Sequence, residues 1–112
     1  MDFENLKFCK LEIFIPKDYL SGLQDLLQKL EAGHIGKYDS CLSYYEVTGT
    51  WRPLENSNPF KGTQNEISKE PELKVEVTCK IENLNEIIEA IKKFHPYEEP
   101  VINAIPLLKI GL

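Results

Sequence analysis

Hydrophobic and polar positions alternate in two segments of the chain, residues 7–15 and 73–79. The apolar side of the first segment carries Cys9, Leu11, Ile13 and Ile15, and that of the second carries Leu73, Val75, Val77 and Cys79. A period of two residues is typical of a strand with one buried face. Residues 41–51 are rich in β-branched and aromatic side chains and predict another strand. A last strand is expected from about Val101 to Leu108.

Two other segments carry apolar residues at spacings of three and four, which predicts amphipathic helices. The first follows Pro16 and carries the stripe Tyr19, Leu20, Leu23, Leu26, Leu27 and Leu30. The second carries Leu84, Ile87, Ile88, Ile91 and Phe94. We expect Gly33 to form the C-cap of the first helix and Asn83 to cap the start of the second. His95-Pro96 ends the second helix, because a residue before proline disfavours the helical conformation.

The order of predicted elements is β-α-β-β-α-β, and residues 1–112 are expected to form a single α+β domain with a ferredoxin-like fold. Both helices then cover one face of an antiparallel sheet. The other face would be lined by Phe8, Phe14, Tyr44 or Tyr45, and Trp51. A large apolar face usually marks an interface, so we expect a homo-oligomer.

A polar stretch, about 52–69, contains two prolines, a glycine and three asparagines. We expect it to form a long hairpin arm or mobile loop. Long loops within compact domains are often functional.

The net charge of −5 and the absence of a basic stripe argue against a nucleic-acid partner. Three cysteines without a CxxC pair favour a reducing compartment. The N-terminus does not resemble a signal peptide, and no apolar run is long enough to cross a membrane, so we expect a cytoplasmic protein without a membrane partner.

Two glycine-containing stretches are not explained by periodicity. In the first, Gly33 and the residues His34, Gly36, Lys37 and Tyr38 could cradle an anion through backbone N–H groups, with Lys37 adding charge. The alternative, which we favour, is a helix C-cap followed by a tight turn. The second stretch holds Thr48, Gly49 and Trp51. A glycine inside a strand suggests a bulge or a close backbone approach. The tryptophan could stack a ligand or anchor an interface, and we favour the interface because large aromatic side chains on a sheet face usually pack.

A third stretch, from His95 to Pro100, gathers His95, Tyr97, Glu98 and Glu99 with two prolines. It could supply metal ligands or a general acid–base pair. We favour a rigid corner in which His95 satisfies the carbonyl end of the second helix. The cysteines are expected to be buried apolar residues, and no motif supports a catalytic triad. We therefore assign no catalytic residue, metal site or cofactor.

The runs GHIGKYDSC, TGTWRP, NPFKGT and HPYEEPVINAIPL together resemble the insert domain of the Nif-three-like (dinuclear metal centre) proteins. That insert is related to the PII signalling proteins and to the CutA divalent-cation-tolerance proteins. The resemblance extends from about Lys7 to Leu108 and implies a PII/CutA-like fold, most often assembled as a trimer. It also implies a stand-alone domain, without the flanking halves that hold the metal ligands and the hydrolase-type activity.

The resemblance further implies that nine residues surround a ligand cleft or interface: His34, Gly36, Tyr38, Thr48, Gly49, Trp51, His95, Tyr97 and Glu98. Trp51 departs from the family pattern, which often has phenylalanine or another apolar residue there. The leading hypothesis is a non-catalytic, oligomeric binding or regulatory module for a small anionic ligand or a protein partner. The alternatives are a divalent metal-ion binding protein of the CutA type, and a small hydrolase or accessory to a Nif-three-like metal hydrolase.

Overall fold

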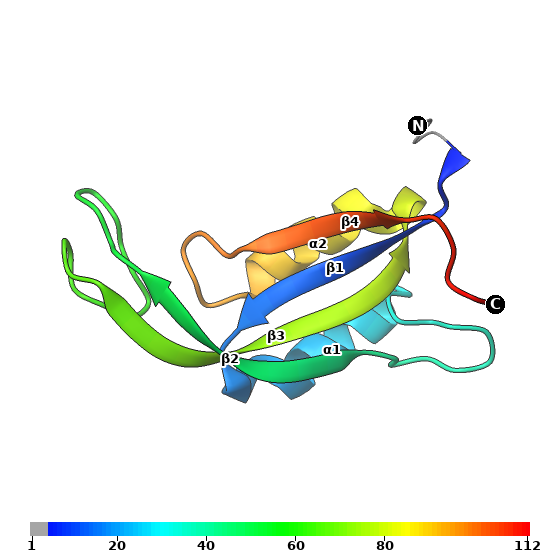
Figure 1. Cartoon of the computed structure of the whole chain (residues 1–112), viewed down its shortest axis with the longest axis horizontal. Coiled ribbons are helices and arrows are strands. Elements are labelled where there is room, and N and C mark those ends of the chain that lie inside the picture. The colour runs from blue at the N-terminus through cyan, green and yellow to red at the C-terminus, as the bar shows by residue number, and fades with distance from the viewer. Residues whose placement is uncertain (1–4) are drawn as a thin grey trace.

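The computed structural model describes residues 5–112, and they form a four-stranded antiparallel sheet in the order β2-β3-β1-β4 (Figure 1). The strands are β1 (Phe8–Ile15), β2 (Ser43–Trp51), β3 (Ser68–Lys80) and β4 (Ile102–Leu107). The helices are α1 (Leu20–Lys29) and α2 (Leu84–Phe94), each preceded by a short 3-10 turn, Lys17–Tyr19 and Ile81–Asn83. The predicted ferredoxin-like α+β fold is confirmed.

Both helices lie on one face of the sheet, and the core fills the space between the two layers (Figure 1). The strands contribute the residues that alternate in the sequence: Cys9, Leu11, Ile13, Ile15, Leu73, Val75, Val77 and Cys79. The helices contribute Leu23, Leu27, Ile87 and Ile91, with Ala32 closing the end of α1. Each fully buried aliphatic side chain contributes about 1.5–3 kcal/mol relative to the exposed state, so the two amphipathic patterns fix the layer arrangement.

The second sheet face is not the apolar surface that the sequence suggested. Its centre carries two cross-strand ion pairs, Lys10 with Glu76 at 3.5 Å and Lys74 with Glu12 at 3.1 Å. The Lys74 ammonium also lies 5.8 Å from the ring centroids of both Phe14 and Tyr45. The alternation correctly predicted which residues of β1 and β3 face away from the helices. The charged residues among them lie on these two central strands, so the middle of this face is polar.

The end of α1 differs from the prediction. Glu31, with a φ of 63°, takes the left-handed position that was assigned to Gly33. The N–H groups of Glu31 and Ala32 donate to the carbonyls of Gln28 and Leu27, a Schellman arrangement. Gly33 instead permits a close approach, because a side chain there would collide with the carbonyl of Cys41.

The second helix ends as predicted at Phe94, and His95 is extended. Asn83 occupies the N-cap position of this helix as predicted, but its side chain makes no cap hydrogen bond. Here the 3-10 turn leads the chain into the helix.

Strand β3 begins at Ser68 and is longer than the alternation predicted. Its first part lies beside β2 alone, because the pairing with β1 ends at Leu73. Pro71 is tolerated there, where β3 has one neighbouring strand and not two. The segment that joins β2 to β3 is residues 52–67, which we call the arm, and it extends beyond the end of the two-layer body (Figure 1).

None of the helices within residues 5–112 is long and apolar enough to cross a membrane.

Candidate functional site

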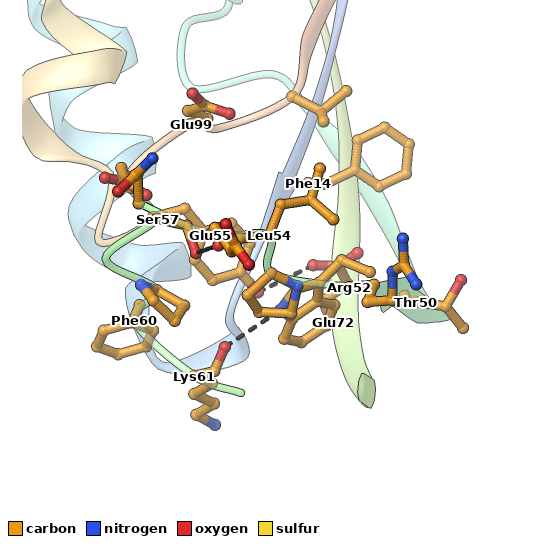
Figure 2. Close-up of a pocket in the computed structure, with 18 residues that line it drawn as sticks. Phe14, Thr50, Arg52, Leu54, Glu55, Ser57, Phe60, Lys61, Glu72 and Glu99 are labelled. Carbon is orange, nitrogen blue, oxygen red and sulfur yellow. Dashed lines mark hydrogen bonds between the residues drawn. The ribbon is translucent and has the colours of Figure 1, made fainter. Parts of the chain in front are cut away.

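A cleft of about 690 Å³ opens between the arm and the segment 95–101, which we call the corner (Figure 2). The arm supplies one wall, with Leu54, Ser57 and Phe60 among its lining residues. Phe14 of β1 and Glu72 of β3 line it from the sheet. This volume lies within the range of sites that hold small organic molecules.

Aromatic side chains hold the arm against the body. The Phe60 ring packs at a centroid distance of 6.1 Å from Tyr97 of the corner and 6.5 Å from Tyr19 before α1. The backbone N–H of Asn58 donates to the Glu98 carboxylate at 2.9 Å. Residues far apart in the sequence therefore meet across the cleft, and they do so through one ring and one hydrogen bond.

Trp51 is held at the base of the arm. Its indole N–H donates to the carbonyl of Lys61 at 3.1 Å, and its ring centroid lies 6.2 Å from that of Tyr97. From the sequence we favoured an interface role for this tryptophan over ligand stacking. Its position makes it a lining residue of the cleft.

Gly49 has a specific steric role. A side chain at this position would collide with the carboxylate of Glu72, which is only 8% exposed. The Tyr97 hydroxyl donates to Glu72 Oε2 at 3.0 Å. Burial, together with this carboxylate, raises the pKa of Tyr97 well above its ordinary value and keeps the phenol protonated as a donor. The close approach predicted for this glycine is therefore to a side chain across the hairpin.

His95 is buried, and both nitrogens of its ring are engaged. Nε2–H donates to the carbonyl of Phe14 at 2.6 Å, and Nδ1 accepts the backbone N–H of Tyr97 at 3.1 Å. Burial lowers the pKa of His95, with the bond to Phe14 acting in the opposite direction, so the neutral ring is favoured. These bonds fit the interpretation as a rigid corner. The ring was expected to satisfy the carbonyl end of α2, but it contacts β1 instead.

The GHIGKY stretch lies at the opposite end of the sheet (Figure 1). Ile35 and Tyr38 exchange backbone hydrogen bonds of 2.8 and 3.0 Å around Gly36 and Lys37. Gly36 has a φ of 58°, as the first central residue of a two-residue hairpin turn often requires. The two glycines are thus explained by backbone geometry.

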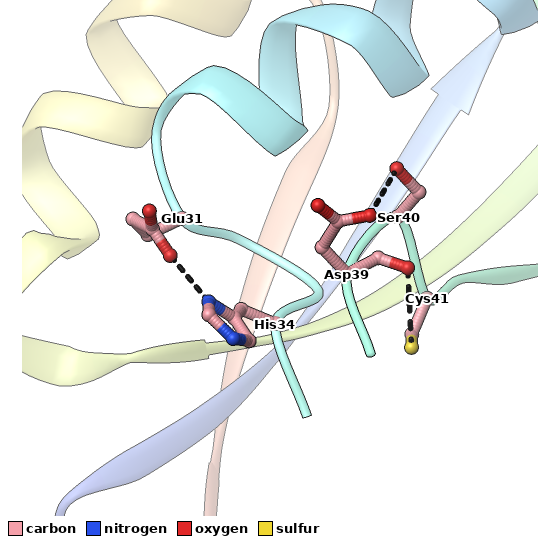
Figure 3. A network of polar contacts seen from close by, with 5 residues as sticks. All are labelled: Glu31, His34, Asp39, Ser40 and Cys41. Carbon is pink, nitrogen blue, oxygen red and sulfur yellow. Dashed lines mark hydrogen bonds and ion pairs between the residues drawn. The ribbon is translucent and has the colours of Figure 1, made fainter. Parts of the chain in front are cut away.

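The exposed His34 ring contacts the Glu31 carboxylate at 2.5 Å, and that contact raises the pKa of His34 (Figure 3). The nearby hydroxyl of Ser40 donates to Asp39 (Figure 3). His34 is therefore paired with an acid of its own turn.

The structure thus divides the predicted site residues into three groups. Four line the cleft: Gly49, Trp51, Tyr97 and Glu98. Thr48 and His95 adjoin it without lining it, and His34, Gly36, Lys37 and Tyr38 lie at the far end of the chain's sheet. Sequence reasoning did not assign Phe14, Glu72 or Phe60 to this site, although Phe14 was expected on the open face of the sheet.

The lining of the cleft carries more negative than positive charge. It includes four glutamates, Glu55, Glu72, Glu98 and Glu99, and two cations, Arg52 and Lys61. Residues 5–112 hold no group of three or more His, Cys, Asp or Glu side chains that could bind a metal ion. This balance favours a cationic ligand over the anion that the sequence suggested.

Sequence comparison relates the chain to two groups of proteins. The model of the CutA1 divalent ion tolerance protein family matches residues 62–111. A "GTP cyclohydrolase 1 type 2 homolog" of Halalkalibacterium halodurans is 37% identical over 102 residues, which are 91% of this chain and 27% of that protein. A protein with the same description from Bacillus subtilis is 33% identical over 88% of this chain and 26% of its own length. The chain spans about a quarter of these curated relatives.

Solved structures show the same two likenesses. A NIF3-related protein of Bacillus cereus superposes with a TM-score of 0.80 at 27% identity, over 93% of this chain and 26% of that one. The periplasmic divalent cation tolerance protein CutA of Archaeoglobus fulgidus gives a TM-score of 0.70 at 19% identity, over 94% and 87% of the two chains. The chain thus has a ferredoxin-like fold of the kind found in CutA, and it resembles a domain-sized segment of the NIF3-related proteins.

Proposed function

We propose that the chain is a non-catalytic binding module that holds a small molecule in the cleft between the arm and the corner. The observation that carries this proposal is the way the cleft is enclosed. Its far wall is the arm, which the Phe60 ring and the Asn58–Glu98 hydrogen bond join to the body. A ligand between these walls can contact both and favour the closed arrangement.

The hydrogen bonds of His95 argue against a hydrolase. A general base needs a free nitrogen within reach of a substrate proton. Here Nε2 donates to a backbone carbonyl and Nδ1 accepts a backbone N–H. The use of His95 with Glu98 or Glu99 as a catalytic pair would require both bonds to break.

Divalent metal-ion binding remains the alternative, and the divalent-cation tolerance for which the CutA relatives are named motivates it. Within residues 5–112, no cluster of three potential ligand side chains supports it. We therefore rank the cleft above a metal site.

We further propose that the chain self-associates, as a trimer, in a reducing compartment such as the cytoplasm. The two outer strands of the sheet carry exposed apolar side chains, including Tyr44, Tyr45 and Ile105. All three cysteines are free. Sedimentation equilibrium tests the subunit number, and a monomer at all concentrations would contradict self-association.

Ligand binding is tested by a screen of nucleotides, amines, carboxylates and divalent cations, followed by thermal shift and by the fluorescence of Trp51, the chain's single tryptophan. We expect at least one class of compound to bind wild type, and Phe60→Ala to weaken its binding. Ile67→Ala is the matched control, because Ile67 lies in the same arm, is 71% exposed and does not line the cleft. No saturable response to any class would refute the proposed function.

A further inference from the structure

Glu72 is a buried carboxylate without a cationic partner. Among residues 5–112, the buried polar or charged residues are Glu72 and His95, which are 8% and 6% exposed. None of the ion pairs in this part of the chain includes Glu72. Its hydrogen-bonding partner is the neutral hydroxyl of Tyr97, at Oε2. A buried carboxylate is costly unless it is paired with a cation or fully hydrogen bonded.

The other carboxylate oxygen of Glu72, Oε1, lies against Gly49 at the boundary of the cleft. Oε1 occupies the space that a side chain at position 49 would fill, so Gly49 makes room for it. Both residues line the cleft, and no hydrogen bond from the described residues reaches Oε1. The site therefore has a fixed oxygen acceptor at its boundary, held in place through the other oxygen by Tyr97.

Aromatic rings accompany this acceptor. Trp51, Phe60 and Tyr97 line the same cleft, and the Tyr97 ring centroid is 6.2 Å from that of Trp51 and 6.1 Å from that of Phe60. The face of an aromatic ring attracts a cation, and the attraction increases when water is excluded. Leu54, Pro53 and Val101 add apolar surface.

We propose, as an extension of the binding function above, that the ligand of this cleft is an organic cation, an alkylammonium or guanidinium group on an apolar body. The charged group pairs with Glu72, and the apolar body lies against the aromatic rings. Glu98 and Glu99 add negative charge at the corner side of the cleft.

Two other classes of ligand fit less well. A hydrated metal ion requires several oxygen ligands and gains little from tryptophan and phenylalanine. An anion would depend on Arg52 and Lys61, which are both exposed. An anion would also be repelled by Glu72, which a cation would neutralise.

The test is a titration of Trp51 fluorescence with tetramethylammonium, butylammonium, spermidine and butylguanidinium, at fixed ionic strength. Sodium, magnesium and inorganic phosphate are run as comparison ions. We expect saturable changes with the organic cations alone. Glu72→Gln keeps an acceptor for Tyr97 but removes the charge, and is expected to raise the dissociation constant about tenfold or more. Glu46→Gln, an exposed β2 acid outside the cleft, is the matched control.

The outcomes separate this proposal from the one on which it rests. Equal affinity in wild type and Glu72→Gln, or binding of phosphate or nucleotides in place of amines, overturns the organic-cation assignment and leaves a binding cleft standing. Saturation by magnesium at similar concentrations overturns it in favour of a metal site. No response to any compound overturns both. Should Glu72→Gln be unstable, Trp51→Leu followed by calorimetry tests the aromatic contribution instead, and unchanged affinity there counts against the proposal.

Discussion

Replacing His95 by alanine tests whether this residue is a structural part of the corner. The imidazole ring joins β1 to the corner through two backbone groups, the carbonyl of Phe14 and the N–H of Tyr97. Each buried backbone group left without a partner costs about 1–3 kcal/mol, so His95→Ala is expected to lower the free energy of unfolding by about 2–6 kcal/mol. For a domain whose total stability is about 5–15 kcal/mol, such a loss is large.

The same variant changes the pH dependence of stability. Burial lowers the pKa of His95 below its ordinary value of 6.5. As pH falls through this value, the unfolded chain binds a proton that the folded chain excludes, so stability decreases. The stability that His95 contributes is thus present above about pH 6.5 and is lost in mild acid. The difference between wild type and His95→Ala should therefore shrink between pH 7.5 and pH 5.

Urea unfolding followed by Trp51 fluorescence measures both effects. His34→Ala is the matched control, because His34 is exposed and its contact with Glu31 raises its pKa. Its contribution has the opposite sign, present at low pH and lost as pH rises through the raised pKa. His95→Gln, whose amide can both donate to Phe14 and accept from Tyr97, should lose less stability than His95→Ala. If His95→Ala unfolds within about 1 kcal/mol of wild type at pH 7.5, the structural role is refuted.

Three further predictions concern Gly49, the cysteines and Phe60. Gly49→Ala forces the Glu72 carboxylate out of its position and is expected to lower stability by about 1–3 kcal/mol in the same urea assay, whereas the exposed neighbour Thr48→Ala should have little effect. One thiol of the native protein, the partly exposed Cys41, should react promptly with a disulfide reagent at pH 8, and all three should react in urea. Cys9 and Cys79 are buried, and their sulfur atoms lie 3.4 Å apart. Burial, and to a lesser extent the contact with Cys9, raises the pKa of Cys79 to about 12. Fast reaction of all three thiols in the native protein would therefore contradict this packing. Phe60→Ala should speed proteolytic cleavage within residues 52–67, Ile67→Ala should not, and equal rates would show that the ring does not hold the arm.

The fold was predictable because both periodicities are strong and local. Alternation at Leu73, Val75 and Val77 identifies a strand, and the spacing of Ile87, Ile88 and Ile91 identifies a helix. The errors fall where one residue type can serve two geometries. A glycine after a helix commonly forms the cap, but Glu31 takes that position and Gly33 serves a contact with the next strand.

The site was predictable only in part, because its members meet through the path of the arm. Glycine inside a strand correctly indicated a close approach at Gly49, and the unusual stretch around Tyr97 correctly marked the corner. Nothing in the pattern indicated that Phe60 returns to the body, since a polar loop carries no periodicity. The same gap hid Glu72, whose burial depends on Tyr97 from a different segment.

The length of β3 connects the fold to the cleft. Because β1 stops opposite Leu73 and β3 begins at Ser68, the outer part of the hairpin has a single neighbouring strand. The position of the arm then depends on a few contacts, chiefly the Phe60 ring and the Asn58–Glu98 and Trp51–Lys61 hydrogen bonds, and not on strand pairing. Segments held by few buried contacts open at a low cost in free energy. A ligand that bridges the arm and Glu72 would therefore shift the population of arm conformations toward the closed cleft. Glu72 belongs to the stable two-layer body, where it is next in sequence to Leu73 of the core. Phe60, which forms the aromatic wall of the cleft, belongs to the movable arm. Ligand binding and arm closure are therefore expected to form one coupled equilibrium, in which Glu72 keeps its position and the arm moves toward it.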